Sequence, residues 1–343
     1  MSRPDVSVVI VSYNTRELIL RCLTELYASL AGGPSESVTT QSGSVTTPSG
    51  SVSAEVVVVD NASTDGSADA VADRFPQVRL VRLTDNVGFG RGVNRGALAS
   101  SGRYLLCLNP DTEPVGNPVA TLVDFADRHP GHGMYTGRTL RPDGTDDNYS
   151  CWGLPTVWST VGFATGLSTV LRGRAWADPE GLPGYDRRTV REVPALSGCL
   201  LLIERELFGR LGGFDPRYFL YSEDIDLSTR ARALGARPVL TPDAQVVHLV
   251  GASSSSEGQR IRLLRGRSTY LRQHWSPTRA RLGIGLLTAG VGLRALGRTL
   301  LGRDRSRGVD WVDVWRARGD WASGYPPVDE DRPTTERLAG LPR

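Results

Sequence analysis

Four apolar segments in the first third of the chain each end in polar side chains, and one of these ends is acidic. Asp111 stands at the acidic end, in the run Asn109-Pro110-Asp111 that follows the apolar residues 105–108. In an open α/β sheet, ligands bind outside the carboxyl ends of the strands. A carboxylate at such an end supplies the hard oxygen ligands that Mg²⁺ and Mn²⁺ prefer. The spacing therefore predicts a metal-diphosphate site within a nucleotide site. The four polar clusters are 12–14, 60–61, 84–86 and 109–111.

The elements that would position these clusters alternate between strand and helix. Residues 6–11 form a nearly continuous apolar run, which is typical of a strand covered on both faces. Residues 16–30 follow with apolar positions at helical spacing. The alternation continues and predicts a doubly wound, mostly parallel α/β sheet. The further expected elements are strands at 55–59, 78–83 and 103–108 and helices at 67–75 and 91–99.

A dinucleotide-binding domain is an alternative, because Gly88, Gly90 and Gly92 are spaced like part of a glycine fingerprint. That fingerprint directly follows the first strand of its fold, where this chain has residues 12–15 and no glycine. We therefore expect these glycines to shape a turn into a helix and not to bind a nicotinamide or flavin cofactor.

Seven short motifs follow one another along the chain. They are Val-Ser-Tyr-Asn at 11–14, Val-Val-Asp-Asn-Ala-Ser-Thr-Asp-Gly-Ser at 58–67, Asn-Val-Gly-Phe-Gly-Arg-Gly-Val-Asn at 86–94, Leu-Asn-Pro-Asp-Thr at 108–112, Gly-Gly-Phe-Asp at 212–215, Tyr-Ser-Glu-Asp-Ile-Asp-Leu at 221–227 and His-Leu-Val-Gly-Ala-Ser at 248–253. Over residues 5–275 this ordered set resembles the family 2 glycosyltransferases of GT-A fold, specifically their bacterial rhamnosyltransferase-like branch. The resemblance implies a Rossmann-like nucleotide-binding half joined to an acceptor half.

Asp60, at the end of the second strand, is a candidate ligand for the donor nucleotide. Its carboxylate can accept hydrogen bonds from the imide N–H of uracil or thymine, or from ribose hydroxyls. Helix capping is the alternative role. Because residues 61 and 63–65 are all competent N-cap residues, we expect one of them to cap the next helix and Asp60 to bind the ligand.

The resemblance implies further donor contacts. Tyr13 would lie against the base, and Ser12, Arg91 and Asn94 would contribute to the donor site. Asn109 replaces the first acid of the family's Asp-x-Asp motif, so an oxygen is kept but a charge is lost. Direct ligation of the metal by Asn109 therefore stays open, and a lower metal affinity is expected.

His248 follows a short predicted strand, where the family has a histidine as a further metal ligand. A structural role is the alternative reading of a single histidine. Together with Asp111, an imidazole ligand is more consistent with Mn²⁺ than with Mg²⁺. The expected cofactor is thus Mn²⁺ or Mg²⁺ bound by Asp111 and His248.

The run Glu223-Asp224-Ile225-Asp226 begins a predicted helix, where the helix dipole by itself favours acidic side chains. Neighbouring residues on a helix point about 100° apart, so the three carboxylates cannot serve one purpose. The resemblance implies that Asp224 is the general base. Asp226 is placed to pair with Arg230 one turn later.

Residues 133–195 have weak periodicity, several glycines and prolines, and the aromatic residues Trp152, Trp158, Trp176 and Tyr185. Segments of this kind often carry specificity. Packing against a sugar or a lipid-linked acceptor and filling of the core are both open roles for these rings.

We divide the chain into a GT-A domain at 1–275 and a C-terminal extension at 276–343. Residues 32–53 are rich in Ser, Thr and Gly and contain an imperfect tandem repeat, so we expect a flexible insertion there. The four cysteines are scattered singly, which predicts buried, reduced thiols.

The C-terminal extension predicts a basic amphipathic helix. Residues 258–308 hold twelve Arg and one acid, a local charge of +11 in a chain of net charge +3, which leaves −8 elsewhere. Such a helix could lie on an anionic cytoplasmic leaflet or pack on the catalytic domain. No motif for nucleic-acid recognition accompanies the arginines, so nucleic acid is not an expected partner. The apolar face comprises Leu282, Leu286, Ala289, Leu293, Leu296 and Leu300.

The chain shows neither a secretory leader nor a run of about 18 apolar residues, so we expect a cytoplasmic protein, peripheral on the cytoplasmic face of the membrane. The implied function is inverting, metal-dependent transfer of a sugar from a dTDP- or UDP-sugar to a lipid-linked or other cell-envelope glycan, with rhamnose as the expected sugar. Galactofuranosyl or other UDP-sugar transfer is one alternative. A non-catalytic nucleotide-sugar-binding protein is the other.

Overall fold

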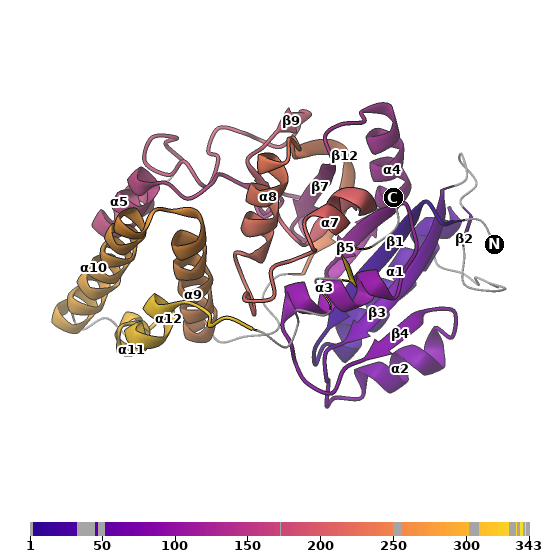
Figure 1. Cartoon of the computed structure of the whole chain (residues 1–343), viewed down its shortest axis with the longest axis horizontal. Coiled ribbons are helices and arrows are strands. Elements are labelled where there is room, and N and C mark those ends of the chain that lie inside the picture. The colour runs from indigo at the N-terminus through magenta and orange to yellow at the C-terminus, as the bar shows by residue number, and fades with distance from the viewer. Residues whose placement is uncertain are drawn as a thin grey trace.

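The computed structural model describes residues 3–32, 45–46, 52–171, 173–249, 256–301 and 309–328, and four single positions at 334, 337, 338 and 340. A ten-stranded sheet runs through one part of the molecule with helices on both of its faces (Figure 1). A group of helices lies at the opposite end, away from the first strands (Figure 1). The expected α/β class and the C-terminal helices are confirmed.

The first half of the sheet is parallel. β1 (Val6–Ser12) lies between β3 (Ser53–Asp60) and β5 (Tyr104–Leu108), and β4 (Arg79–Arg82) joins the outer side of β3. Ser12 lies opposite Asp60, and Ile10 lies opposite Leu108. The polar strand ends therefore meet at one edge of the sheet, as the alternation predicts. The helices between these strands are α1 (Arg16–Ala31), α2 (Ser67–Arg74) and α3 (Phe89–Leu98).

The second half of the sheet is mixed. β11 (Leu200–Glu204) runs antiparallel to both β5 and β7 (Met134–Leu140). β12 (Val239–His248) runs parallel to β7 and carries β6 (Thr112–Val115) antiparallel at the outer edge. The remaining strands are short: β2 (Val45–Thr46) on β3, β9 (Arg191–Glu192) on β12, and a separate pair of β8 (Cys151–Trp152) with β10 (Ala195–Leu196).

Two hydrophobic clusters cover the two faces of the sheet. Since side chains alternate along a strand, Val8 and Ile10 of β1 face one cluster, and Val9 and Val11 face the other. This burial on both sides explains the continuous apolar sequence of β1. All four cysteines are buried and unpaired, as predicted. The helices on the first face include α1 and α4 (Pro118–Arg128), and those on the second include α3, α7 (Arg205–Arg210) and α8 (Glu223–Ala233).

The helical group has its own core, which includes Leu271, Ile284, Val291 and Trp321. One of its helices lies in the range that we assigned to the GT-A domain, so the two expected parts share this helix. None of the helices in the described parts of the chain is long and apolar enough to cross a membrane. The group consists of α9 (Ser256–His274), α10 (Pro277–Leu301), α11 (Trp311–Arg316) and α12 (Arg318–Ser323), and α10 also packs on α5 (Val157–Thr165), which α6 (Leu167–Val170) follows.

The insertion expected at 32–53 lies largely outside the described residues. Within it, Gly32 ends α1 in the left-handed conformation, and β2 pairs with β3. The flexibility of the insertion stays a prediction.

α9 approaches the segment that precedes α8 very closely. Tyr221 and Ser222 have φ values of 71° and 72°, which residues other than glycine rarely adopt. A Cβ atom on Gly266 of α9 would lie 2.1 Å from the backbone oxygen of Tyr221. Glycine at 266 therefore allows α9 to pack against this strained segment and hold it in place.

We expect Gly266→Ala to destabilise the protein by about 1–3 kcal/mol, because the added methyl group must displace the backbone at Tyr221. Urea unfolding measures this change. Gly297→Ala in α10 is the matched control, since nothing lies within 4 Å of a Cβ atom at that position. Equal stability of the Gly266→Ala variant and the native protein would contradict this account of the contact.

Candidate active site

Strand pairing brings Asp111 and His248 together. β6 and β12 are antiparallel with His248 opposite Thr112, and the N–H of Leu249 donates to the backbone oxygen of Asp111 at 2.8 Å. As a result, Nε2 of His248 lies 3.4 Å from Oδ2 of Asp111. The two residues proposed as metal ligands thus lie side by side at the end of the sheet.

Asp147 holds the other side of the histidine ring. Its Oδ2 lies 3.1 Å from Nδ1 of His248, while its Oδ1 accepts from the Thr139 hydroxyl and, at 2.7 Å, from the N–H of Tyr149. This arrangement directs Nδ1–H to Asp147 and leaves Nε2 facing Asp111. Burial lowers the pKa of the His248 imidazole, but the hydrogen bonds to Asp111 and Asp147 outweigh burial and hold that pKa above its ordinary value.

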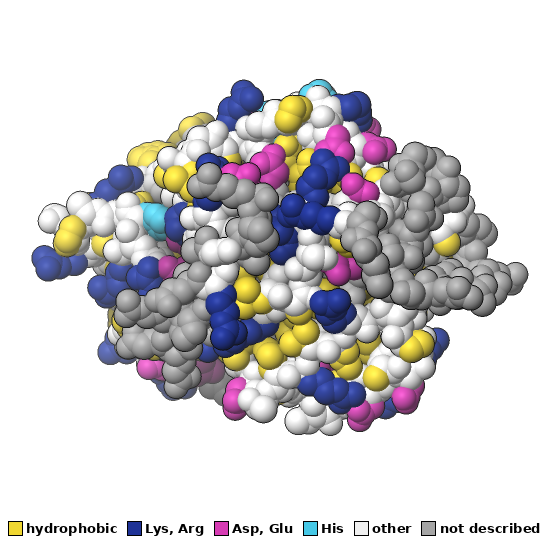
Figure 2. Space-filling view, turned by 45° about the vertical axis from the view of Figure 1, so that its right-hand side comes forward, with side chains coloured by type: hydrophobic (Ala, Val, Ile, Leu, Met, Phe, Trp, Pro, Cys, Tyr) yellow, Lys and Arg dark blue, Asp and Glu magenta, His cyan; other side chains and the backbone are white. Residues whose placement is uncertain are grey.

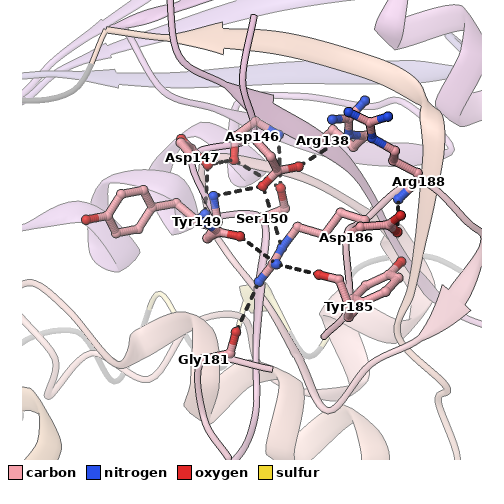
Figure 3. Close-up of polar contacts among 12 residues, drawn as sticks. Arg138, Asp146, Asp147, Tyr149, Ser150, Gly181, Tyr185, Asp186 and Arg188 are labelled. Carbon is pink, nitrogen blue, oxygen red and sulfur yellow. Dashed lines mark hydrogen bonds and ion pairs between the residues drawn. The ribbon is translucent and has the colours of Figure 1, made fainter. Parts of the chain in front are cut away.

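The loop that carries Asp147 is braced by arginines. Figure 3 shows Asp146, Asp147 and Ser150 close to Arg138 and to the Tyr185 segment. The buried Arg187 donates to Asn148 Oδ1 at 2.8 Å and to the backbone oxygen of Tyr185 at 2.9 Å. Sequence reasoning missed Asp147, because a loop without periodicity gives no sign of which strand end it folds against.

The side chains of Asp111 and His248 suit a divalent metal that is bound together with a diphosphate. Asp111 offers a carboxylate and His248 offers Nε2, but within the described residues no group of three or more His, Cys, Asp or Glu side chains could hold a metal ion. A cation with two protein ligands needs further oxygens, and Mg²⁺-type sites take these from substrate phosphates and water. The donor set therefore does not suit a structural metal that binds without substrate.

Asp60 presents an unused oxygen at the same edge of the sheet. Its Oδ2 accepts from the N–H of Ser63 at 3.1 Å, whereas Oδ1 is buried with no hydrogen-bond partner among the described residues. A buried oxygen of this kind costs free energy unless a ligand supplies a donor. None of residues 61 and 63–65 is the N-cap of α2, since Gly66 holds that position and makes no side-chain cap. Asp65 nevertheless contributes at this end of the helix, because its Oδ1 accepts from the N–H of Ser67, the first residue of α2, at 3.0 Å.

The other side chains that we expect to contact the donor differ in their solvent exposure. Tyr13 is about half exposed at the end of β1, so its ring is available to a ligand. The Ser12 hydroxyl is buried and shares a hydrogen bond of 2.8 Å with the hydroxyl of Thr15. Arg91 is partly exposed in the first turn of α3 and already interacts within the protein.

The Asn94 side chain lies inside the protein and bonds to the backbone of another segment. Its side chain is buried, its Nδ2 donates to the backbone oxygen of Phe214 at 2.8 Å, and its Oδ1 accepts from the N–H of Phe214 at 2.9 Å. Both polar ends of the amide are therefore engaged in joining α3 to the segment before α8. A contact of Asn94 with the donor stays a prediction, and the structure adds this second role for the side chain.

Two hydrogen bonds link Asp224 to the strand end beside Asp111 and His248, two residues that we call the metal corner. The Asp224 carboxylate is partly exposed, and it accepts from the N–H of Gly198 at 3.3 Å and from the N–H of Ile225 at 2.8 Å. The next residue, Cys199, accepts from the N–H of Asn109 at 3.0 Å through its backbone oxygen. Burial raises the pKa of the Asp224 carboxyl. These contacts connect the Asp224 carboxylate to the strand end that carries Asp111. The raised pKa makes this carboxylate a stronger base than an ordinary aspartate.

The two neighbouring acids have different surroundings. Asp226 is buried and pairs with Arg230 at 2.8 Å, as predicted, and also with Nε2 of His274 at 2.7 Å. Glu223 is buried, and its Oε2 has no hydrogen-bond partner within the described part of the chain. Burial and the nearby Asp224 carboxylate raise the pKa of Glu223 to about 8.

We expect Asp147→Ala to weaken Mn²⁺-dependent binding of a nucleoside diphosphate by about 10- to 100-fold, because His248 loses the acceptor that orients it. Calorimetric titration of Mn²⁺ into protein and dTDP or UDP measures this change without turnover. Asp143→Asn is the control, since Asp143 lies exposed in the same loop. Unchanged Mn²⁺ affinity in a folded Asp147→Ala variant would show that Asp147 does not act through His248.

We expect the stability of the protein to fall as pH rises from about 4.5 to about 8, because over this range Glu223 ionises more readily in the unfolded chain than in the folded one. Glu223→Gln should remove part of this fall and should be more stable than the native protein at pH 8. Thermal unfolding at pH 5 and pH 8 tests both points. Glu206→Gln, at an exposed position of α7, should keep the native fall. An identical pH profile for Glu223→Gln and the native protein would be evidence against the raised pKa.

The sequence matches the family described as glycosyl transferase family 2 over residues 7–211. It is 31% identical over 231 residues to N-acetylglucosaminyl-diphospho-decaprenol L-rhamnosyltransferase of Mycobacterium tuberculosis, a match that covers 63% of this chain and 73% of the relative. It is also 31% identical over 210 residues to the O-antigen biosynthesis protein RfbC of Myxococcus xanthus, covering 59% of this chain and 15% of that protein.

Solved structures agree at the level of the fold. The mannosyltransferase PcManGT from Pyrobaculum calidifontis, in complex with GDP-Man and Mn²⁺, superposes with a TM-score of 0.52 at 20% identity and covers 99% of this chain and 85% of its own. Staphylococcus aureus TarS 1–349 in complex with UDP gives a TM-score of 0.50 at 15% identity, covering 98% and 87%. The chain therefore belongs to glycosyl transferase family 2 and has the GT-A fold.

Proposed function

We propose that this glycosyltransferase is an inverting, metal-dependent enzyme that moves L-rhamnose from dTDP-rhamnose to a polyprenyl-diphosphate-linked glycan of the cell envelope. The observation that supports the proposal is the pair of hydrogen bonds that links the Asp224 carboxylate, through Gly198 and Cys199, to Asn109 beside the proposed metal ligand Asp111. The choice of sugar and acceptor is supported by the mycobacterial relative, whose name specifies both a rhamnosyl group and a decaprenyl-diphosphate-linked acceptor.

In the proposed reaction, Asp224 takes the proton of an acceptor hydroxyl while the hydroxyl oxygen bonds to the anomeric carbon. The bond between that carbon and the diphosphate oxygen breaks on the opposite face, so one displacement inverts the configuration. The N–H groups of Gly198 and Ile225 hold the carboxylate in position for this transfer. When bound between Asp111, His248 and the diphosphate, a divalent cation would stabilise the charge of the leaving group.

The nucleotide would bind along the ends of β1, β3 and β5. Asp60 offers the unused Oδ1 to the imide N–H of a thymine or uracil base, or to ribose hydroxyls. The half-exposed ring of Tyr13 would lie against the base. The other proposed donor contacts are Ser12, Arg91, Asn94 and Asn109.

We place the reaction at the cytoplasmic face of the membrane, because a polyprenyl-linked acceptor is held in the lipid. Since no described helix can span a bilayer, this contact would be peripheral. Galactofuranosyl or other UDP-sugar transfer is a second candidate, because Asp60 suits uracil as well as thymine. A non-catalytic nucleotide-sugar-binding protein is a third, because Asn109 removes one charge from the metal corner.

We expect Asp224→Asn to lower turnover by about 100- to 10,000-fold while donor binding persists, because an amide cannot accept the proton. Binding is followed by thermal shift with dTDP-rhamnose, UDP-galactofuranose and GDP-mannose, each with Mn²⁺ or with chelator. A ligand at 100 times its Kd stabilises the folded protein by ~2.7 kcal/mol, which is a visible shift.

The control is Asp124→Asn, at an exposed position of α4, which should leave turnover and binding unchanged. A shift with UDP-galactofuranose in place of dTDP-rhamnose would select the second candidate. Normal turnover of Asp224→Asn would exclude the proposed base. Donor binding by the native protein without transfer to any lipid-linked acceptor would select the non-catalytic candidate.

A further inference from the structure

One face of α10 is exposed along the whole helix and bears no charge. The helix has 25 residues and is therefore about 37 Å long. The leucine stripe predicted from the sequence lies almost entirely on this outer face, with Leu293 59% exposed and Leu300 74% exposed. We call this surface the leucine face; it comprises Leu282, Gly285, Ala289, Leu293, Leu296 and Leu300.

The opposite side of α10 provides the packing that holds the helix in place. Ile284, Leu287 and Val291 lie in the core of the helical group. Arg294 lies over the ring of Phe163 in α5, with 4.4 Å between its Cζ and the ring centroid. The helix therefore packs on the protein, and it does so through residues other than the stripe. This packing leaves four of the five stripe leucines exposed, whereas Leu286 is partly buried. The two expected roles of the helix are therefore compatible.

The surroundings of the leucine face are basic. No Asp or Glu occurs from residue 258 to residue 303. Arg279 and Arg281 are exposed at the start of α10, on either side of the leucine face. Arginine side chains also gather at the left of Figure 2, at the end of the molecule that carries the helical group. An anionic surface complements this distribution of charge.

Large aromatic residues are exposed on the elements beside α10. α5 contacts α10 closely, since a Cβ atom on Gly290 would lie 2.7 Å from Cα of Ala164. Trp158 of α5 is 49% exposed, and its indole N–H donates to the backbone oxygen of Trp176, which is 55% exposed. Exposed indoles are typical of proteins that lie at a membrane–water interface. Leucines suit the acyl layer of a membrane surface, indoles suit its interface, and arginines suit its anionic headgroups.

We propose that the leucine face of α10 lies flat on an anionic lipid bilayer, with Arg279 and Arg281 among the headgroups. The purpose of this contact rests on the proposed function, because a polyprenyl-linked acceptor is held in the same bilayer. The evidence for the contact is independent of that function. Amphipathic helices bind in this orientation through buried apolar area and through attraction to anionic lipids.

Sedimentation of the full-length protein with vesicles, without donor or acceptor, tests the proposal. The native protein should bind vesicles of phosphatidylcholine and phosphatidylglycerol more tightly than vesicles of phosphatidylcholine alone. The double variant Leu293→Glu/Leu296→Glu should bind both at least tenfold more weakly, because two charged groups would enter the apolar layer. Arg279→Gln and Arg281→Gln should each weaken binding to the anionic vesicles about fivefold.

Leu234→Glu is the matched control, since Leu234 is 50% exposed at the end of α8, outside the helical group. It should bind vesicles like the native protein. Equal binding by the native protein and the double leucine variant would overturn the proposal. A second result would also overturn the proposal. If no form of the protein binds vesicles, and light scattering shows a native dimer that the double variant abolishes, then a second copy covers the leucine face. Vesicle binding without sugar transfer would contradict the proposed function but would support the membrane contact.

Discussion

The candidate active site depends on the register between β6 and β12. Antiparallel pairing places His248 opposite Thr112, and this alone brings its imidazole to the side chain of Asp111. Side chains alternate along a strand, so a slip of one residue would turn the imidazole to the other face of the sheet. The register is held by the parallel pairing of β12 with β7, whose end also holds Asp147 through Thr139.

Two acidic side chains near the candidate active site, Asp60 and Glu223, are buried at a cost to stability. Oδ1 of Asp60 and Oε2 of Glu223 are buried without a hydrogen-bond partner among the described residues. Each costs stability in the free protein, because a buried polar oxygen has lost its water. For Asp60, a donor nucleotide would supply the missing hydrogen bond. For Glu223, the pKa is raised to about 8, so the carboxyl is protonated at neutral pH. The protein therefore avoids the free-energy cost of burying a charged carboxylate there.

The helical group connects the catalytic segment to the outer surface of the protein. Gly266 of α9 packs against Tyr221, and the hydroxyl of Tyr325 donates to the backbone oxygen of Leu220 at 2.9 Å. These contacts hold the strained residues that lead into α8 and therefore position Asp224. The same group presents the leucine face of α10. A protein that takes its acceptor from lipid would benefit from this direct connection, because the membrane contact and the base are then fixed relative to each other.

The sequence by itself determined the α/β class, the strand ends that carry Asp60 and Asp111, the pair of Asp226 with Arg230 and the burial of the cysteines. These features depend on local periodicity and on neighbours one helical turn apart. Only the tertiary structure decided that His248 meets Asp111, that Asp147 orients the ring, that Asn94 bonds to the backbone of Phe214 and that the leucine stripe faces outward. Each of these depends on contacts between segments distant in the chain. Periodicity shows that a helix has an apolar face, but packing decides which face the protein covers.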